Sequence, residues 1–165
     1  MSNLIFMTVK GSTQGLISEG AFTPASVGNI YQNGHEDEIF INSYDYGAST
    51  PVNLASGQPM GQRTHDSLNI IKLVDKSSPL LFEAHNKGET LTHVELKAYR
   101  TSYMGKQEHF YTIALEDARI VNLNSSSSSG IEPTEIISFS YRKITLRHET
   151  ASTSSSDDLR VGAKG

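Results

Sequence analysis

Residues 34–72, GHEDEIFINSYDYGASTPVNLASGQPMGQRTHDSLNIIK, contain two apolar runs joined by a long polar segment. Residues 38–46 are rich in Ile, Phe and Tyr, which favour a half-buried strand, and residues 66–74 form a second apolar run. The segment between them, residues 47–65, is rich in Gly, Ser, Pro, Asn and Gln. Connections in compact domains are usually about 4–6 residues long, so this segment, here called the arm, is predicted to be functional or disordered.

The composition is that of one small domain. A chain of 165 residues can bury a core without disulfide staples. The absence of cysteine excludes a disulfide framework and thiolate metal sites, and it fits folding in a reducing compartment. The net charge of −4 provides no basic footprint for nucleic acid. The apolar run at residues 4–9 is too short to span a membrane and lacks the charged start of a signal peptide, so we expect neither membrane insertion nor a cleaved leader.

Residues 4–9, LIFMTV, are apolar at both even and odd positions. A strand of this kind is buried on both faces. In a small β protein one of those faces can be covered by another subunit. Ile5, Met7 and Val9 are therefore candidate subunit-interface residues.

Three further strands and one helix are predicted downstream. Residues 91–100 and 108–117 alternate between apolar and polar side chains, and residues 101–106 form the turn between them. Residues 134–148 change the parity of their apolar positions partway, which predicts a bulge or a bend between two sheets. A helix is expected over residues 79–87, with Ser78 as its N-cap and Gly88 just past its end.

These elements predict a mainly β fold: a two-sheet β-barrel or sandwich with one α-helix and a long extended loop. Residues 1–149 form the single barrel domain. The serine run at residues 125–129 is expected to be a solvated loop tip, and residues 150–165 a flexible C-terminal tail.

The chain contains no motif for catalysis, for a cofactor or for a metal. Its six histidines have no metal-ligand spacing, and neither a nucleophile elbow nor a phosphate-binding glycine loop is present. We therefore expect no catalytic, cofactor-binding or metal residues. Two alternatives remain open on these grounds: a monomeric ligand- or carbohydrate-binding β-barrel, and a small hydrolase.

Several segments, in order, resemble one known family. They are GHEDEI entering a strand, SGQPMGQRTH in the arm, KSSPLLFEAHNKGE, YRTSYMGKQEHFYTIALEDARI and SFSYRKITLRHE. Together they are similar to the haemolysin-coregulated protein (Hcp) family, the tube proteins of the bacterial type VI secretion system. The similarity runs from Ile5 to His148.

The resemblance implies a barrel that assembles as a homohexameric ring, with rings stacking into a tube whose pore carries small effector proteins. It also implies contacts with the spike and with sheath or baseplate components. Such a protein resides in the bacterial cytoplasm before firing and is then secreted or delivered into target cells. The arm is implied to contact a neighbouring copy, which makes it an assembly arm with these candidate residues: Ser49, Pro51, Asn53, Gln58, Met60 and Gln62. Ser43 and Asp45 share one polar parity of their strand and are predicted to face the pore.

Overall fold

The computed structural model describes residues 3–160. Its strands are β1 Leu4–Gly11, β2 Gly15–Leu16, β3 Ile39–Asp45, β4 Ala48–Ser49, β5 Thr64–His65, β6 Leu68–Leu73, β7 Leu91–Thr101, β8 Gln107–Ser128, β9 Ile131–Ser140, β10 Lys143–His148 and β11 Thr153–Asp158. The helices are α1 Pro24–Val27, the 3-10 turn η1 Gly28–Ile30 and α2 Ser78–Lys87. Within this part of the chain, the main sheet runs β11-β10-β8-β7-β1-β3-β6-β9, with β2 beside β1.

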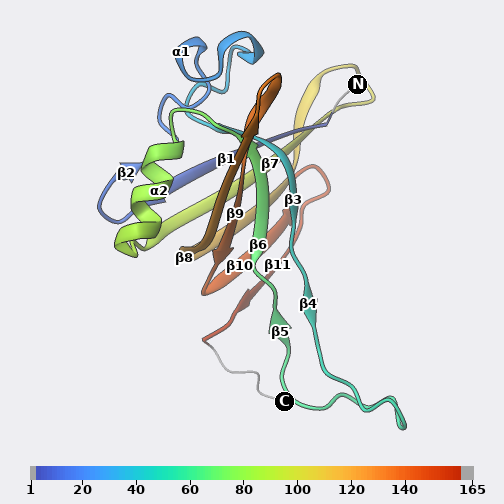
Figure 1. The fold of residues 1–165 in the computed structure, drawn as a ribbon. Coiled ribbons are helices and arrows are strands. Elements are labelled where there is room, and N and C mark those ends of the chain that lie inside the picture. The colour runs from blue at the N-terminus through green and yellow to red at the C-terminus, as the bar shows by residue number, and fades with distance from the viewer. Residues whose placement is uncertain (1–2, 161–165) are drawn as a thin grey trace.

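The main sheet closes into a barrel because β8 is long enough to be used twice. Its first part pairs with β7 on one side and β10 on the other, and its second part pairs with β9. The β8–β9 pairing joins the last strand of this order back to β8, so that β8, β7, β1, β3, β6 and β9 close into a barrel without open edges. Strands β10 and β11 extend from β8 as a wing, α2 lies beside the barrel, and the arm projects away from it (Figure 1). The predicted mainly β fold with a helix and an extended loop is confirmed.

The interior of the barrel is a packed core. Every strand of the closed barrel contributes a fully or almost fully buried side chain, among them Met7, Ile41, Ile70, Leu96, Leu115 and Ile137. A barrel of this size is just wide enough for side chains to fill it. The function of the chain therefore has to be sought on its outer surfaces.

Strand β1 is buried on both faces, but by its own chain. Met7 and Val9 are fully buried in the core. On the opposite face Phe6 is also fully buried, stacked on His35 with ring centroids 3.9 Å apart and in edge contact with Phe22 at 5.2 Å. The segment between β2 and β3 supplies this cover. The assignment of Met7 and Val9 to a subunit interface is therefore wrong, and only the partly buried Ile5 keeps surface for a neighbour.

The change of parity in residues 134–148 marks a break between two strands. β9 ends at Ser140 after pairing with β6 and β8, and β10 begins at Lys143 and pairs with β8 and β11. The parity change therefore marks the gap between two strands of one sheet, and the predicted single strand with a bulge or a bend between two sheets is wrong.

Two polar segments form strands where a loop and a tail were expected. Residues 125–128 continue β8 and pair with β9, so only residues 129 and 130 make the turn. Thr153–Asp158 form β11 and pair along the whole of β10. The prediction of a flexible tail is wrong for this strand, and residues 161–165 lie outside the described part of the chain. Both segments are stabilised by backbone pairing and need no buried side chains.

Helix α2 ends as expected and begins differently. Gly88 adopts a left-handed conformation with φ 62° and donates its N–H to the carbonyls of Ala84 and His85. Ser78 is the first helical residue rather than the N-cap. Its hydroxyl accepts the N–H of Asp75 and donates to Glu135, so it joins the helix to the barrel.

A buried ionic cluster holds the start of α2 against the barrel. Lys72 on β6 is fully buried, and its Nζ donates to Glu135 Oε1 at 2.8 Å, Ser78 Oγ at 3.1 Å and Asp75 Oδ1 at 3.2 Å. Asp75 also accepts from the backbone N–H and hydroxyl of Ser77. A buried charged group destabilises a protein unless it is paired with an opposite charge and hydrogen-bonded. The charged groups of this cluster meet both conditions.

Candidate functional site

The arm is an ordered β-hairpin. At its root β4 pairs with β5, and farther out Val52 and Pro59 form an isolated bridge. The backbone N–H of Asn53 donates to the carbonyl of Gln58 at 2.8 Å. Figure 1 shows this hairpin extending well beyond the barrel wall. The arm is therefore a projecting hairpin that is held by its own hydrogen bonds.

The tip of the arm is closed by a turn that Asn53 organises. Its side-chain oxygen accepts the N–H groups of Ala55 and Ser56, and its carbonyl accepts the N–H of Gly57. Gly57 has φ 73°, a conformation that favours glycine. Asparagine side chains commonly bond to the backbone two residues ahead in this way. The turn presents Leu54 at the end of the hairpin with 94% of its surface exposed.

The outer part of the arm is uncharged and exposes three apolar side chains. Residues 47–62 contain no Asp, Glu, Lys or Arg. Val52 and Met60 are about half exposed, and Leu54 is almost fully exposed. A hydrophobic surface without charges is typical of a contact site for another protein. The predicted arm residues all lie on this hairpin and are all exposed: Ser49, Pro51, Asn53, Gln58, Met60 and Gln62.

The root of the arm is bound to the C-terminal strand by Asp157 of β11. Arg63 donates to this carboxylate through Nε at 2.5 Å and Nη2 at 2.6 Å, and His65 Nε2 lies 2.8 Å from it. The hydrogen bonds from Arg63, together with the contact to His65, lower the pKa of Asp157 to about 2. We call this group the root clamp. No sequence pattern predicts this clamp, because Asp157 lies in a segment that is expected to be flexible.

The root clamp predicts a pH dependence for the arm. Because the pKa of Asp157 falls from 3.8 to about 2 on folding, the stabilisation is complete above about pH 4 and is lost as the pH falls towards 2. Asp157→Asn should loosen the arm root even at neutral pH. We expect a lower hydrogen-exchange protection factor at the Asp66 amide, which donates to Gly47. Equal protection in Asp157→Asn and the parent at neutral pH would contradict the clamp.

The surroundings of His65 do not form a hydrolase site. Ser67 and Ser140 line a small depression beside it. Both imidazole nitrogens are already engaged, however, one by Asp157 at 2.8 Å and the other by the Tyr141 hydroxyl at 3.4 Å. Burial raises the pKa of that hydroxyl, which donates to a backbone carbonyl. Among the described residues neither serine hydroxyl is hydrogen-bonded to the imidazole, so no serine–histidine pair forms here.

Ser43 and Asp45 lie on the outer face of the barrel. β3 has an irregular register between Ile41 and Ser43, so the later residues reverse their parity, and both side chains are exposed. Asp45 Oδ1 accepts from Asn69 Nδ2 at 2.8 Å, and Asn69 Oδ1 accepts from the Ser138 hydroxyl at 2.5 Å. These contacts form a polar row across β3, β6 and β9.

An apolar pair lies beside this polar row. Ile71 on β6 is paired directly with Ile136 on β9, and both side chains are partly exposed. Ser43 is the neighbour of Ile71 on β3. The outer face of these three strands, here called the outer wall, therefore combines hydrogen-bonding groups with a small hydrophobic strip.

Comparison with known proteins decides the family. The family model described as type VI secretion system effector, Hcp, matches residues 6–148. The chain belongs to the Hcp family. It is 45% identical to the Major exported protein of Pseudomonas aeruginosa over 172 residues, which covers all of both chains.

Solved Hcp structures have the same fold. A crystal structure of an Hcp protein is 44% identical and has a TM-score of 0.91, covering 96% of this chain and 99% of its own. The secreted protein Hcp3 from Pseudomonas aeruginosa is 45% identical with a TM-score of 0.82, covering 93% and 98%. The resemblance found in the sequence segments is confirmed, and the chain is a member of a family of β-rich type VI secretion tube proteins.

Residues 3–160 contain neither a membrane-spanning helix nor a cluster of metal ligands. No helix there is long and apolar enough to cross a membrane. In the same residues, no group of three or more His, Cys, Asp or Glu side chains is arranged to hold a metal ion.

Proposed function

We propose that this chain is a structural subunit of the type VI secretion tube, forming homohexameric rings that stack and carry small effector proteins in their pore. The observation that carries the proposal is the arm: a hydrogen-bonded hairpin with an exposed apolar tip, fixed to the barrel at its root. A surface of this kind is stabilised when a neighbouring copy covers it. In this role the chain works by assembly and not by catalysis.

Assembly accounts for export as well. A tube subunit leaves the bacterial cytoplasm through the machine that it builds and reaches the medium or a target cell. Contacts with the spike and with the sheath or baseplate then occur at the end and the outside of the tube. The name Major exported protein, borne by the Pseudomonas aeruginosa relative, supports export.

The molar mass of the purified protein tests the ring. Light scattering coupled to size-exclusion chromatography should give six times the 18.1 kDa of one chain, or a multiple of that ring mass. A single species at the mass of one chain over a wide concentration range would overturn the proposal. That result would favour the alternative of a monomeric ligand- or carbohydrate-binding β-barrel.

The outer wall is the part of the subunit that we place at the pore. Asp45→Lys should reduce retention of an effector of the same system by about tenfold or more, because each copy in the ring repeats the altered charge. The fold should be unaffected, since Asp45 is exposed. Glu19→Lys reverses another exposed charge and should leave retention unchanged. Unchanged retention in Asp45→Lys would remove this residue from the pore.

A further inference from the structure

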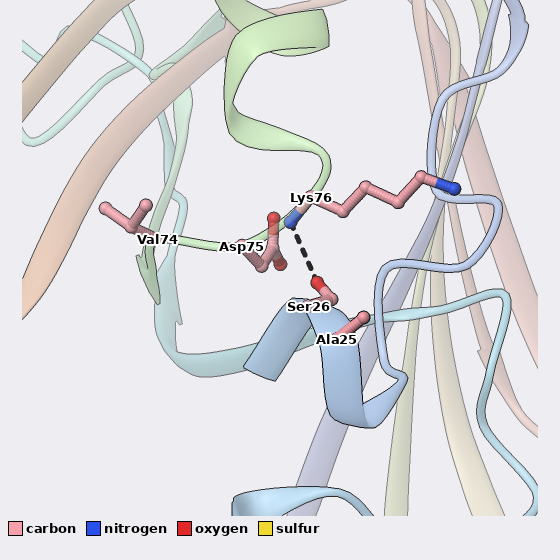
Figure 2. A pocket seen from close by; sticks show the side chains of 5 residues that line it. All are labelled: Ala25, Ser26, Val74, Asp75 and Lys76. Atoms are coloured by element: carbon pink, nitrogen blue, oxygen red, sulfur yellow. Dashed lines mark hydrogen bonds between the residues drawn. The ribbon is translucent and has the colours of Figure 1, made fainter. Parts of the chain in front are cut away.

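A pocket lies at the end of the barrel opposite the arm. It is lined by Ala25 and Ser26 of α1 and by residues 74–76, which connect β6 to α2, and it has a volume of about 380 Å³ (Figure 2). Binding pockets for small molecules start at about 300 Å³, so the space can hold more than one side chain. β6 begins next to the arm root and ends next to this pocket, which places the two features at opposite ends of one strand.

Two polar side chains of the pocket, Ser26 and Asp75, already have partners inside the subunit. The Ser26 hydroxyl donates to the Ala21 carbonyl and accepts the backbone N–H of Lys76, the bond drawn in Figure 2. Asp75 is paired with Lys72 and Ser77.

The Lys76 side chain extends away from Val74 in Figure 2. Ala25 and Val74 thus remain as exposed apolar groups, Val74 with 40% of its surface accessible. Such a pocket favours an uncharged, apolar occupant.

We propose that the pocket receives Leu54 at the arm tip of a second copy of this chain. The inference rests on the proposed function, in which copies associate head to tail. The arm tip matches the pocket in chemistry, since residues 47–62 carry no charge and Leu54 is 94% exposed. Among the described residues, Tyr103 and Met104 in the β7–β8 turn form another exposed tip, which lies close in sequence to the charge of Lys106 and matches the pocket less well.

The arm of a copy cannot fill that copy's own pocket. At about 3.3 Å per residue, β6 separates the arm root from the pocket by about 20 Å, and the hairpin carries Leu54 roughly a further 15–20 Å in the opposite direction. A projection and a receptor at opposite ends make a heterologous contact, in which every copy both gives and receives. Contacts of this kind build stacks that continue along one axis.

Disulfide cross-linking tests the contact, because the chain has no native cysteine. The double variant Leu54→Cys with Val74→Cys, oxidised at concentrations that give stacks, should form a ladder of multimers on a non-reducing gel. Either single variant should stop at dimers. Tyr103→Cys with Val74→Cys tests the competing tip and should give no ladder.

A substitution in the pocket gives a second readout. Ala25→Arg places a charge on an exposed position of the pocket and should weaken stacking by about 10- to 100-fold. This is the change in affinity expected when one leucine is no longer buried at the contact. Ala151→Arg alters another exposed alanine and should have no effect.

The outcomes separate this inference from the function on which it rests. Stacks seen by microscopy without a ladder from the Leu54–Val74 cysteine pair, or a ladder from the Tyr103–Val74 pair, overturn the pocket assignment alone. If microscopy and cross-linking both find only single chains, the proposed function is overturned as well.

Discussion

Lys72→Met is expected to destabilise the protein by about 3–5 kcal/mol, the usual cost of removing one partner from a buried ion pair. Lys72 is fully buried, and its loss would leave the carboxylates of Glu135 and Asp75 in the interior without a cation. Urea unfolding at a fixed protein concentration measures the change, because association also contributes to apparent stability.

Two variants make this experiment specific. Lys76→Met removes a neighbouring but exposed lysine and should change stability by no more than about 0.5 kcal/mol. Adding Glu135→Leu to Lys72→Met should recover much of the loss, because an apolar pair often replaces a buried ion pair at little cost. If Lys72→Met unfolds at the parent's urea concentration, the cluster does not hold α2 to the barrel.

Replacing residues 51–62 with an Asn-Gly turn is expected to abolish stacking and export while leaving the barrel folded. All of these residues are exposed, so their removal takes nothing from the core. The shorter connection also lowers the entropy cost of closing the loop. Asn-Gly between Thr50 and Arg63 favours a tight hairpin turn and keeps the native register, in which Ser49 pairs with Thr64, so Arg63 and His65 stay at the root clamp. Secretion assays and electron microscopy measure the effect.

A length-matched control separates loss of the arm's surface from loss of its length. In this variant Val52, Leu54 and Met60 are replaced by serine, so the hairpin keeps its backbone but loses its apolar tip. It should fail in the same way as the shortened chain. Normal tubes and normal secretion from the shortened chain would show that the arm has no part in assembly.

Much of the fold was predictable because its strands alternate between apolar and polar side chains. The hairpin of β7 and β8 follows directly from that pattern, and the change of parity within residues 134–148 gives the position at which β9 ends and β10 begins. The serines at the end of β8 and the whole of β11 were missed for the opposite reason. Their side chains are mostly exposed, and what orders them is backbone pairing with a strand elsewhere in the chain.

The assembly site was only partly predictable. Composition identified the arm, but its order depends on distant groups: Arg63 meets Asp157, which lies far along the chain. The apolar pattern of β1 could not say what covers each of its faces: Met7 and Val9 are buried in the barrel core, and Phe22 and His35 cover Phe6 on the other face. A sequence pattern shows that a residue is buried but does not name its partner.

Rings that stack should be visible by electron microscopy of the purified, unmodified protein. Negative-stain images should show six-fold rings with a central pore and, at high concentration, side views of stacks in which the arms bridge successive rings. A field of small single particles, with neither rings nor stacks at any concentration, would contradict the account.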